Sequence, residues 1–198
     1  MNPLRNETTT EHWRVFIAIE LPSVVRKSLS DHIHGLRKAL PDVHASWSRE
    51  ENLHLTLKFL GNTPVAKIEA LSQAAQRAAV RFQPFDLIVG RCGAFPPRGQ
   101  PRVLWIGIDD PTGYLAGLHR TLEDECAKAG FVREDRPFHP HLTIARLRKP
   151  QGSRQLAKLH GEMGFTNQQV SVSELVVFRS ELLSEGSRHT AISRHRFG

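Results

Sequence analysis

The chain has 198 residues, of which 39% are apolar, enough to build a substantial hydrophobic core and to exclude intrinsic disorder and a fibrous fold. Lysine and arginine number 27 against 20 aspartate and glutamate, so the formal net charge of +7 favours an anionic partner. No run of about 18 apolar residues is present, and residues 1–12 are polar. We therefore expect neither a membrane-spanning helix nor a secretory signal, and we predict a cytoplasmic protein with no membrane partner.

The two cysteines, Cys92 and Cys126, are too few for a disulfide framework or, by themselves, for a zinc site. Cys126 shares a helical spacing with neighbouring leucines, which predicts a buried, reduced thiol rather than a catalytic one. The His139-Pro140-His141 sequence has no acidic residues nearby at ligand spacing, so a metal site is not expected there. We predict that the protein uses no metal and no cofactor.

Residues 1–12 are expected to form a flexible tail and residues 13–198 a single domain. Apolar residues alternate with others over residues 13–20, the pattern of a strand with one buried face. A helix is predicted between Pro22 and Pro41, because apolar residues recur at intervals of three or four. These residues are Val25, Leu29, Ile33, Leu36 and Leu40.

A second alternating strand spans residues 53–59, and a second helix follows Pro64 and ends near Phe82. We expect the first lobe of the molecule to end there. The same order of elements then returns in outline, with strands over residues 85–89 and 103–108, a helix over 115–129 and a strand over 141–145. The chain therefore has the form of a duplication.

Residues 93–101 are rich in turn formers and predict a surface loop between two strands. Residues 146–169 are polar and basic, with a helix expected near 155–163, and further strand residues over 170–177 and near Ala191 complete the sheets. Strands and helices are interleaved, but the hairpin-like spacing of the strands favours antiparallel sheets over a doubly wound parallel sheet. The predicted fold class is α+β.

The repeat is clearest at one motif, because His54-Leu55-Thr56-Leu57 returns as His141-Leu142-Thr143-Ile144. Residues i and i+2 of a strand face the same side, so each histidine stands beside a threonine while the apolar residues point into the core. If the two strands lie side by side about a pseudo-twofold axis, both pairs meet in one cleft. The excess positive charge makes that cleft suitable for a phosphate.

The residue types of this motif suit phosphodiester hydrolysis. The reaction needs a base that activates water and an acid that protonates the leaving oxygen, and an imidazole with an ordinary pKa near 6.5 can do either. The hydroxyl groups of Thr56 and Thr143 are placed to donate to the non-bridging phosphate oxygens. No serine or cysteine occupies a recognisable nucleophile setting, so water is expected to attack directly.

Several stretches around these motifs resemble the 2H phosphoesterase superfamily and, within it, the RNA 2',3'-cyclic phosphodiesterases, also called 2'-5' RNA ligases. The resemblance runs from about Val15 to the C-terminus. It is carried by the paired His-x-Thr motifs within residues 52–61 and 140–146, and supported by residues 93–96, 102–107 and 175–180.

The resemblance implies two pseudo-symmetric lobes around a central cleft, each an antiparallel sheet with helices packed outside. It implies metal-independent opening of a terminal 2',3'-cyclic phosphate to a 2'-phosphate, with His54 as the acid on the 3'-oxygen and His141 as the base on water. The family name also records the reverse reaction, which joins RNA ends by a 2'-5' linkage. The implied partners are RNA or nucleotides with 2',3'-cyclic phosphate or 2'-phosphate ends, and a monomer is expected.

Two further residues are candidate substrate contacts. Arg146 lies five residues after His141, so strict alternation places it on the opposite face of the strand. The resemblance makes it a phosphate or ribose contact, which requires a bulge or the end of the strand. Phe59 falls in an apolar strand, where it could stack on a base or join the core. At His189 the family often has an aromatic residue such as tyrosine.

The remaining basic residues could form a rim that follows phosphates or could be ordinary solvated surface. They are Arg98, Arg102, Arg148, Lys149, Arg154, Lys158, Arg188, Arg194 and Arg196. Three functions stay open: an RNA 2',3'-cyclic phosphodiesterase, an enzyme of the same kind acting on another cyclic phosphate or a 2'-5' oligonucleotide, and a non-catalytic module that binds RNA ends.

Overall fold

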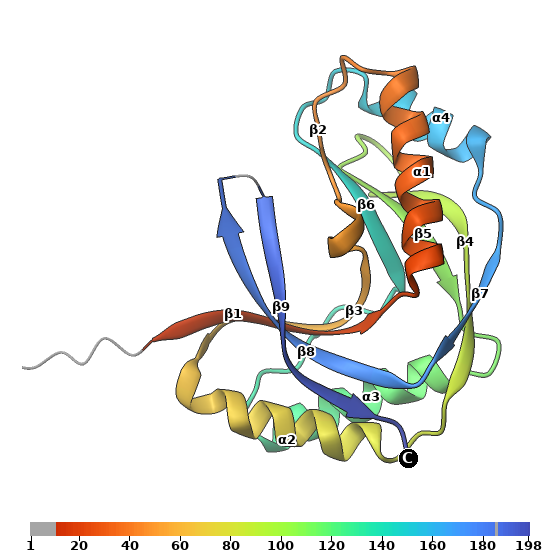
Figure 1. Ribbon diagram of the computed structural model, residues 1–198. Helices are drawn as coiled ribbons and strands as arrows, with labels where there is room; N and C mark the ends of the chain where they lie inside the picture. Colours follow the sequence, from red (N-terminus) through yellow and green to blue (C-terminus); the bar gives the residue numbers. More distant parts are fainter. Residues whose placement is uncertain (1–10, 185) are drawn as a thin grey trace, which may run out of the picture.

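The computed structural model describes residues 11–184 and 186–198, and these residues form two antiparallel sheets flanked by four α-helices (Figure 1). The predicted α+β class is confirmed. The first sheet contains, in spatial order, β3 (His54–Pro64), β1 (His12–Glu20), β8 (Glu174–Leu183) and β9 (Gly186–Arg196). The second contains β2 (Ala45–Trp47), β6 (His141–Leu147), β5 (Val103–Asp109), β4 (Phe85–Phe95) and β7 (Gln168–Val172).

The helices are α1 (Ser23–Ala39), α2 (Ile68–Ala79), α3 (Tyr114–Lys128) and α4 (Ser153–Met163), with short 3₁₀ turns η1 (Glu50–Asn52) and η2 (Val65–Lys67). The predicted apolar stripe of α1 is confirmed, since Val25, Leu29, Ile33 and Leu36 are buried. α4 matches the helix expected near residues 155–163. None of the helices in the described part of the chain is long and apolar enough to cross a lipid bilayer.

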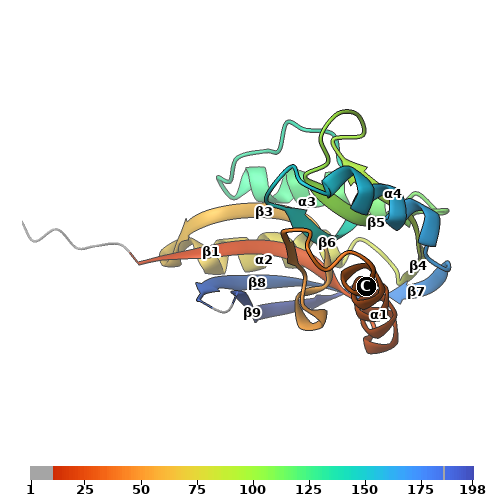
Figure 2. The ribbon, with the colours of Figure 1, turned by 90° about the horizontal axis from the view of Figure 1, so that it is seen from above.

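The two halves of the chain have the same order of elements, which confirms the duplication. β1, α1, β3 and α2 correspond to β5, α3, β6 and α4, and in each half the His-x-Thr strand pairs antiparallel with the first strand. Figure 2 shows the strands of the first sheet side by side. The order β3-β1-β8-β9 is matched in the second sheet by β6-β5-β4-β7, with β2 added at the edge.

The expectation that the first lobe ends near Phe82 is wrong. β8 and β9 come from the end of the chain and complete the first sheet, because β1 and β3 alone would make a two-stranded ribbon of marginal stability. The first helix of each half also crosses over: α1 contacts α4, whereas α3 packs against α2 and contacts β3 (Figure 1). Each lobe is therefore built from both halves of the sequence.

One continuous core joins the lobes, since buried residues of both sheets, such as Leu55 in β3 and Leu142 in β6, belong to the same cluster. The predicted tail lies mostly outside the described residues, and β1 already includes His12. The predicted loop over residues 93–101 begins later than expected. Gly93, Ala94 and Phe95 still pair with β5, and only the residues after them form the connection.

Candidate active site

Both His-x-Thr motifs lie at the start of a strand. His54 is the first residue of β3 and His141 is the first residue of β6, and these two strands contact each other across the junction of the sheets. The leucine after each histidine is buried, whereas the histidines and the threonines are only partly buried. The predicted alternation therefore holds over the motif itself.

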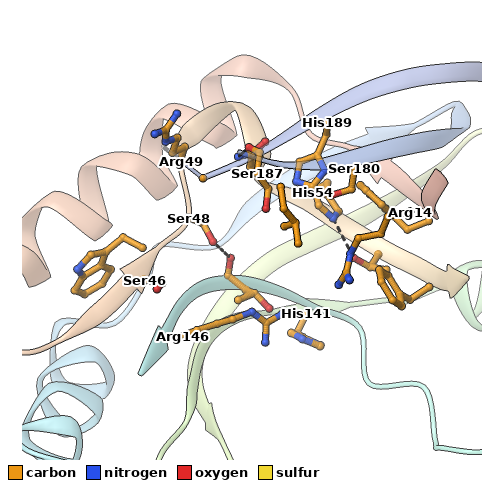
Figure 3. A pocket seen from close by; sticks show the side chains of 18 of the residues that line it. Arg14, Ser46, Ser48, Arg49, His54, His141, Arg146, Ser180, Ser187 and His189 are labelled. Atoms are coloured by element: carbon orange, nitrogen blue, oxygen red, sulfur yellow. Dashed lines mark hydrogen bonds between the residues drawn. The ribbon is translucent and has the colours of Figure 1, made fainter. Parts of the chain in front are cut away.

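The two motifs face a single cleft of about 700 Å³. His54, Thr56, His141 and Thr143 all line it, although the two pairs come from different sheets. Figure 3 shows the histidines on opposite sides of this cleft, with Arg146 beside His141. The structure thus brings together the four residues that the repeated motif singled out.

The imidazole of His54 is held by stacking and by its threonine. Its ring lies against Phe16, with 4.7 Å between the ring centroids, and its Nε2 is 3.0 Å from the Thr56 Oγ1. His189 from β9 approaches it edge-on at 5.4 Å. Burial, and next the neighbouring His189, lower the pKa of His54 from 6.5 to about 4, so the ring is neutral at pH 7 in the free protein.

His141 is held in a defined tautomer. Its Nδ1 is 2.6 Å from the backbone carbonyl of His139. A carbonyl oxygen can only accept, so the proton sits on Nδ1 and Nε2 keeps a free lone pair when the ring is neutral. Burial is the main cause that lowers the pKa of His141, and the bond to His139 partly opposes it. Neutral His141 is therefore suited to accept a proton at Nε2.

A β-bulge in β6 turns Arg146 into the cleft. In the pairing of β6 with β5, two consecutive residues of β5 lie opposite Thr143 and Ala145, so Ile144 is the additional residue. Ile144 and Ala145 are both buried, and the alternation resumes with Arg146 on the cleft side, where His141 also lies. Strict alternation, which places Arg146 on the opposite face, is wrong for this strand.

β3 contains the equivalent bulge. Thr56 and Lys58 lie opposite two consecutive residues of β1, which leaves Leu57 as the additional residue. Leu57 and Lys58 are both buried, and Phe59 then faces the cleft. Phe59 follows His54 by five residues, the same spacing that separates the arginine of β6 from its histidine. Each half of the duplication thus supplies a His-x-Thr pair and a third side chain at the same place.

Phe59 is not part of the core, because 52% of it is exposed. The guanidinium of Arg14 in β1 lies 4.7 Å from the centroid of its ring. Such a cation over an aromatic face gives this end of the cleft both a flat apolar surface and a positive charge.

The cleft is cationic. Its lining includes the arginines Arg14, Arg49, Arg146 and Arg148, and no aspartate or glutamate of the described chain lines it. Of the nine basic residues considered for a rim, Arg148 is the one that lines the cleft. A cleft with this charge and with donor hydroxyl groups is complementary to a phosphate group.

Arg14, Arg49 and Ser48 were missed by the sequence reasoning. Ser48 donates to the Thr143 carbonyl at 2.7 Å and so ties the end of β2 to the second motif. These residues lie on strands and turns that only the sheet pairing brings to the cleft, and no repeat marks them. His189 was noted in the sequence, and it reaches the cleft because β9 pairs with β8 beside β1.

A group of side chains that could hold a metal ion lies outside the cleft. In the described part of the chain, His32, Cys92 and His160 bring one ligand atom each to within 4.8 Å of one another. Cys126, in contrast, is buried in α3 as predicted. His54 and His141 are not among these three residues.

Comparison with known proteins identifies relatives of this chain. The family model described as the 2'-5' RNA ligase superfamily matches residues 25–182. The RNA 2',3'-cyclic phosphodiesterase of Methanothermobacter thermautotrophicus is 33% identical over 182 residues, which cover 89% of this chain and 95% of the relative. The protein of the same name from Thermotoga maritima is 32% identical over 184 residues, covering 93% and 95%.

A solved structure shares the fold. The crystal structure of E. coli LigT complexed with 3'-AMP superimposes with a TM-score of 0.74 at 30% sequence identity, covering 94% of this chain and 99% of that one. The extent of the family match, the identity to the relatives and the paired His-x-Thr motifs all indicate the same family. The chain belongs to the 2'-5' RNA ligase superfamily of 2H phosphoesterases.

Proposed function

We propose that the protein is an RNA 2',3'-cyclic phosphodiesterase that opens a terminal 2',3'-cyclic phosphate to a 2'-phosphate. The observation that carries this proposal is the pair of His-x-Thr motifs on opposite sides of one cationic cleft. The names of the relatives support it, and so does the nucleotide 3'-AMP in the related E. coli structure. The substrates are RNA or nucleotides that end in a cyclic phosphate.

In the proposed reaction His141 is the general base and His54 is the general acid. Nε2 of His141 takes a proton from water, whose oxygen bonds to phosphorus. The bond between phosphorus and the 3'-oxygen breaks, and the imidazolium of His54 protonates that oxygen. The phosphate remains on the 2'-oxygen, and one proton has passed from His54 to the product and one from water to His141. Replacing water by the hydroxyl of a second RNA end would give the 2'-5' linkage.

The acid needs a proton that the free protein does not hold at neutral pH, since the pKa of His54 is lowered to about 4. A phosphodiester anion beside the ring favours the charged imidazolium and raises that pKa. Substrate binding therefore favours the protonation of His54, which takes the proton from the solvent. The proton on His54 and the negative charge of the substrate stabilise each other.

The remaining cleft residues bind the substrate in this proposal. Thr56 and Thr143 donate to the non-bridging oxygens, and Arg146 balances the charge of the phosphate or contacts the ribose. Phe59 offers its exposed ring to a base. None of these contacts requires a second copy of the chain, so a monomer stays the prediction, as does a cytoplasmic location.

The test is hydrolysis of 2',3'-cyclic nucleotides in EDTA, with chromatographic separation of the 2'- and 3'-phosphate products. We expect the 2'-phosphate from the wild-type protein and a loss of at least about 100-fold in kcat for His54→Ala and for His141→Ala. His139→Ala is the matched control, because His139 acts through its backbone carbonyl, which alanine keeps.

Circular dichroism spectra and melting temperatures would show that the variants fold. Full activity of either histidine variant would overturn the assignment of acid and base. Retained binding of a 2'-phosphate nucleotide with no turnover by the wild-type protein would instead support the RNA-end-binding module.

A further inference from the structure

A second groove of about 960 Å³ adjoins the cleft. It lies between the C-terminal end of α1, the strand β2 and the residues that follow β6. Trp47 and Arg148 line both the cleft and this groove, so the two cavities are continuous through these side chains. We call it the α1–β2 groove.

The α1–β2 groove is strongly basic. Arg37 and Lys38 come from the last turn of α1, and Arg148 and Lys149 follow β6. The imidazoles of His34 and His44 also line it, and no aspartate or glutamate of the described chain does. Four full charges with no acidic neighbour in the lining are suited to a row of phosphates.

Arg148 is held in place at the junction between groove and cleft. Its Nε donates to the Ser46 hydroxyl at 2.9 Å, and its backbone N–H donates to the His44 carbonyl at 3.1 Å. Trp47, partly exposed beside it, offers an aromatic surface at the same place. Surfaces that bind single-stranded nucleic acids typically combine cations with aromatic rings in this way.

The groove residues that do not line the cleft lie beyond Arg148, where the two cavities meet. Arg148 follows His141 by seven residues along and just beyond β6, and a strand advances about 3.3 Å per residue, which gives about 23 Å. A cyclic mononucleotide would fill only the cleft. A longer RNA with its cyclic end at His54 and His141 has its upstream phosphates available for the groove.

We propose that the α1–β2 groove binds the phosphates of nucleotides upstream of the cyclic end, so that the preferred substrate is an oligoribonucleotide rather than a mononucleotide. This inference rests on the proposed function, because it places the cyclic end in the cleft. The groove contributes affinity without touching the reacting phosphate.

The test compares a 2',3'-cyclic mononucleotide with an RNA of about eight nucleotides that has the same cyclic end. The variant combines Arg37→Gln, Lys38→Gln and Lys149→Gln, three exposed residues that do not line the cleft. We expect kcat/KM for the RNA to fall at least tenfold, through KM, with kcat/KM for the mononucleotide unchanged. The slope of log affinity against log salt should become less steep by about 2, because three single-strand phosphate contacts are lost.

A matched control removes the same charge elsewhere, with Arg120→Gln, Arg154→Gln and Lys158→Gln, which are exposed and line neither cavity. Equal loss of RNA turnover in both variants, or equal kcat/KM for the two substrates in the wild-type protein, would overturn the groove proposal. If neither substrate is hydrolysed, the proposed function fails. The groove is then tested separately by fluorescence anisotropy with an RNA that ends in a 2'-phosphate, where unchanged affinity of the groove variant overturns it.

A different observation, on the second lobe, carries an independent inference. His32 of α1, Cys92 of β4 and His160 of α4 converge, with the His32 Nε2 and the His160 Nδ1 2.9 Å apart. The His160 Nε2 is 3.0 Å from the Trp105 carbonyl, which can only accept. The proton of His160 is therefore on Nε2, and its Nδ1 lone pair faces the His32 Nε2, with the Cys92 thiol within 4.8 Å. A carbonyl on the far nitrogen is the usual support of a metal-binding histidine.

The geometry points to a zinc site formed by the His32 Nε2, the His160 Nδ1 and the Cys92 thiolate, with water as the fourth ligand. Two nitrogens bound to zinc at 2.0–2.1 Å in a tetrahedral arrangement lie about 3.4 Å apart, so a small movement from 2.9 Å suffices. Zinc would displace the thiol proton and leave His32 protonated at Nδ1. The ion would link α1 and α4 to β4 and stabilise the second lobe without entering the reaction.

Titration of the metal-free protein with Co²⁺ tests this site. We expect one equivalent to give a thiolate-to-cobalt absorption band in the near ultraviolet, and Zn²⁺ to displace it and raise the melting temperature. Cys92→Ser and His32→Gln should each abolish the band or weaken cobalt binding at least tenfold, whereas Cys126→Ser, which removes the buried thiol of α3, should leave it unchanged. Absence of the band, or a band lost only in Cys126→Ser, would overturn the proposal.

Discussion

At the residue scale, the surroundings of His54 determine its protonation state. The ring is stacked on Phe16, faces His189 and touches Thr56. Burial is the largest cause of its lowered pKa, and the repulsion from His189 adds to it. The pKa of His141 is also lowered, chiefly by burial. Both rings are therefore mostly neutral above pH 6.5 in the free protein. His141, the proposed base, is then in the form that the reaction needs, whereas His54, the proposed acid, lacks its proton.

This arrangement predicts an acidic optimum for kcat/KM, which reports groups of the free enzyme. Above the higher of the two histidine pKa values, the fraction of protein with His54 protonated and His141 neutral falls tenfold per pH unit. Both values lie below 6.5. We expect kcat/KM to decline from below pH 6.5 upward, and the decline of kcat to lie at higher pH, because bound phosphate raises the pKa of His54.

The measurement is a pH series of initial rates with a cyclic nucleotide, together with NMR titration of the His54 ring in the free protein. An NMR pKa near 6.5 for His54, or a kcat/KM that stays constant up to pH 8, would contradict the prediction. His139→Ala retains the carbonyl bonded to His141 and removes only the smallest of the causes that lower the pKa of His141, so its profile should lie close to that of the wild-type protein.

The site was predictable from the sequence only as far as the repeat extends. His54 and His141 could be paired because the two motifs are identical except at their fourth residue, Leu57 in one and Ile144 in the other. Arg146 could not be placed, because the bulge that turns it into the cleft arises from the pairing of β6 with β5. The same applies to Phe59 in β3. A bulge buries two consecutive residues, here Ile144 and Ala145. An analysis that assumes strict alternation of the two faces cannot detect it and assigns every later residue to the wrong face.

At the element scale, β4 and β5 approach closely beside the cleft. A Cβ on Gly93 would lie 2.1 Å from the indole of Trp105, which packs over the glycine. Phe95 packs on the same indole at 5.3 Å and meets the His141 ring at 5.1 Å. Because Gly93 has no side chain, Trp105 can pack over it and support Phe95, which in turn contacts the ring of His141.

We predict that Gly93→Ala destabilises the protein by about 1–3 kcal/mol, because the indole must move out of a packed site. Gly161→Ala is the matched control. Gly161 lies within α4 with nothing inside 4 Å of an added Cβ, so alanine should stabilise the helix by about 0.5–1 kcal/mol. Urea denaturation of both variants measures the two free energies of unfolding. Equal effects of the two substitutions would contradict the close packing at Gly93.

The elements that the sequence predicted are those with a long periodic pattern. α1 shows its apolar stripe from Val25 to Leu36 and is confirmed. β2 has only three residues and pairs along one edge of β6, so no alternation could reveal it. β9 confirms the strand predicted near Ala191, but its full length, Gly186–Arg196, could not be read from so few apolar residues. The length of β9 is set by its pairing along β8.

At the scale of the whole molecule, a buried ion pair joins the two halves of the chain. Lys58 of β3 is 3% exposed at its side chain, and its Nζ lies 2.7 Å from the Glu123 carboxylate of α3. The same Nζ donates to the Val132 carbonyl at 2.8 Å, and the Glu134 backbone N–H donates to Glu123. Because α3 crosses over to the first lobe, this pair holds the strand of His54 against the second half of the sequence.

Removing one partner should be more harmful than removing both. Lys58→Met leaves the Glu123 carboxylate buried without its cation, for which we predict a loss of about 3–5 kcal/mol in the free energy of unfolding. The double variant Lys58→Met with Glu123→Leu should recover much of that loss, because no uncompensated charge remains. The exposed pair of Lys27 and Asp31 is the control, and Lys27→Met should change stability by less than about 0.5 kcal/mol.

A double-mutant cycle in urea, run on Lys58→Met, Glu123→Leu and the combined variant, measures the coupling directly. Additive losses would show that the two side chains contribute separately and that this pair does not couple the two halves. With coupling, Lys58→Met should also lower the turnover of cyclic nucleotides, since Lys58 precedes Phe59 on the strand that begins with His54. The double variant should then regain activity together with stability, which separates a loss of positioning from a direct role of Lys58 in the reaction.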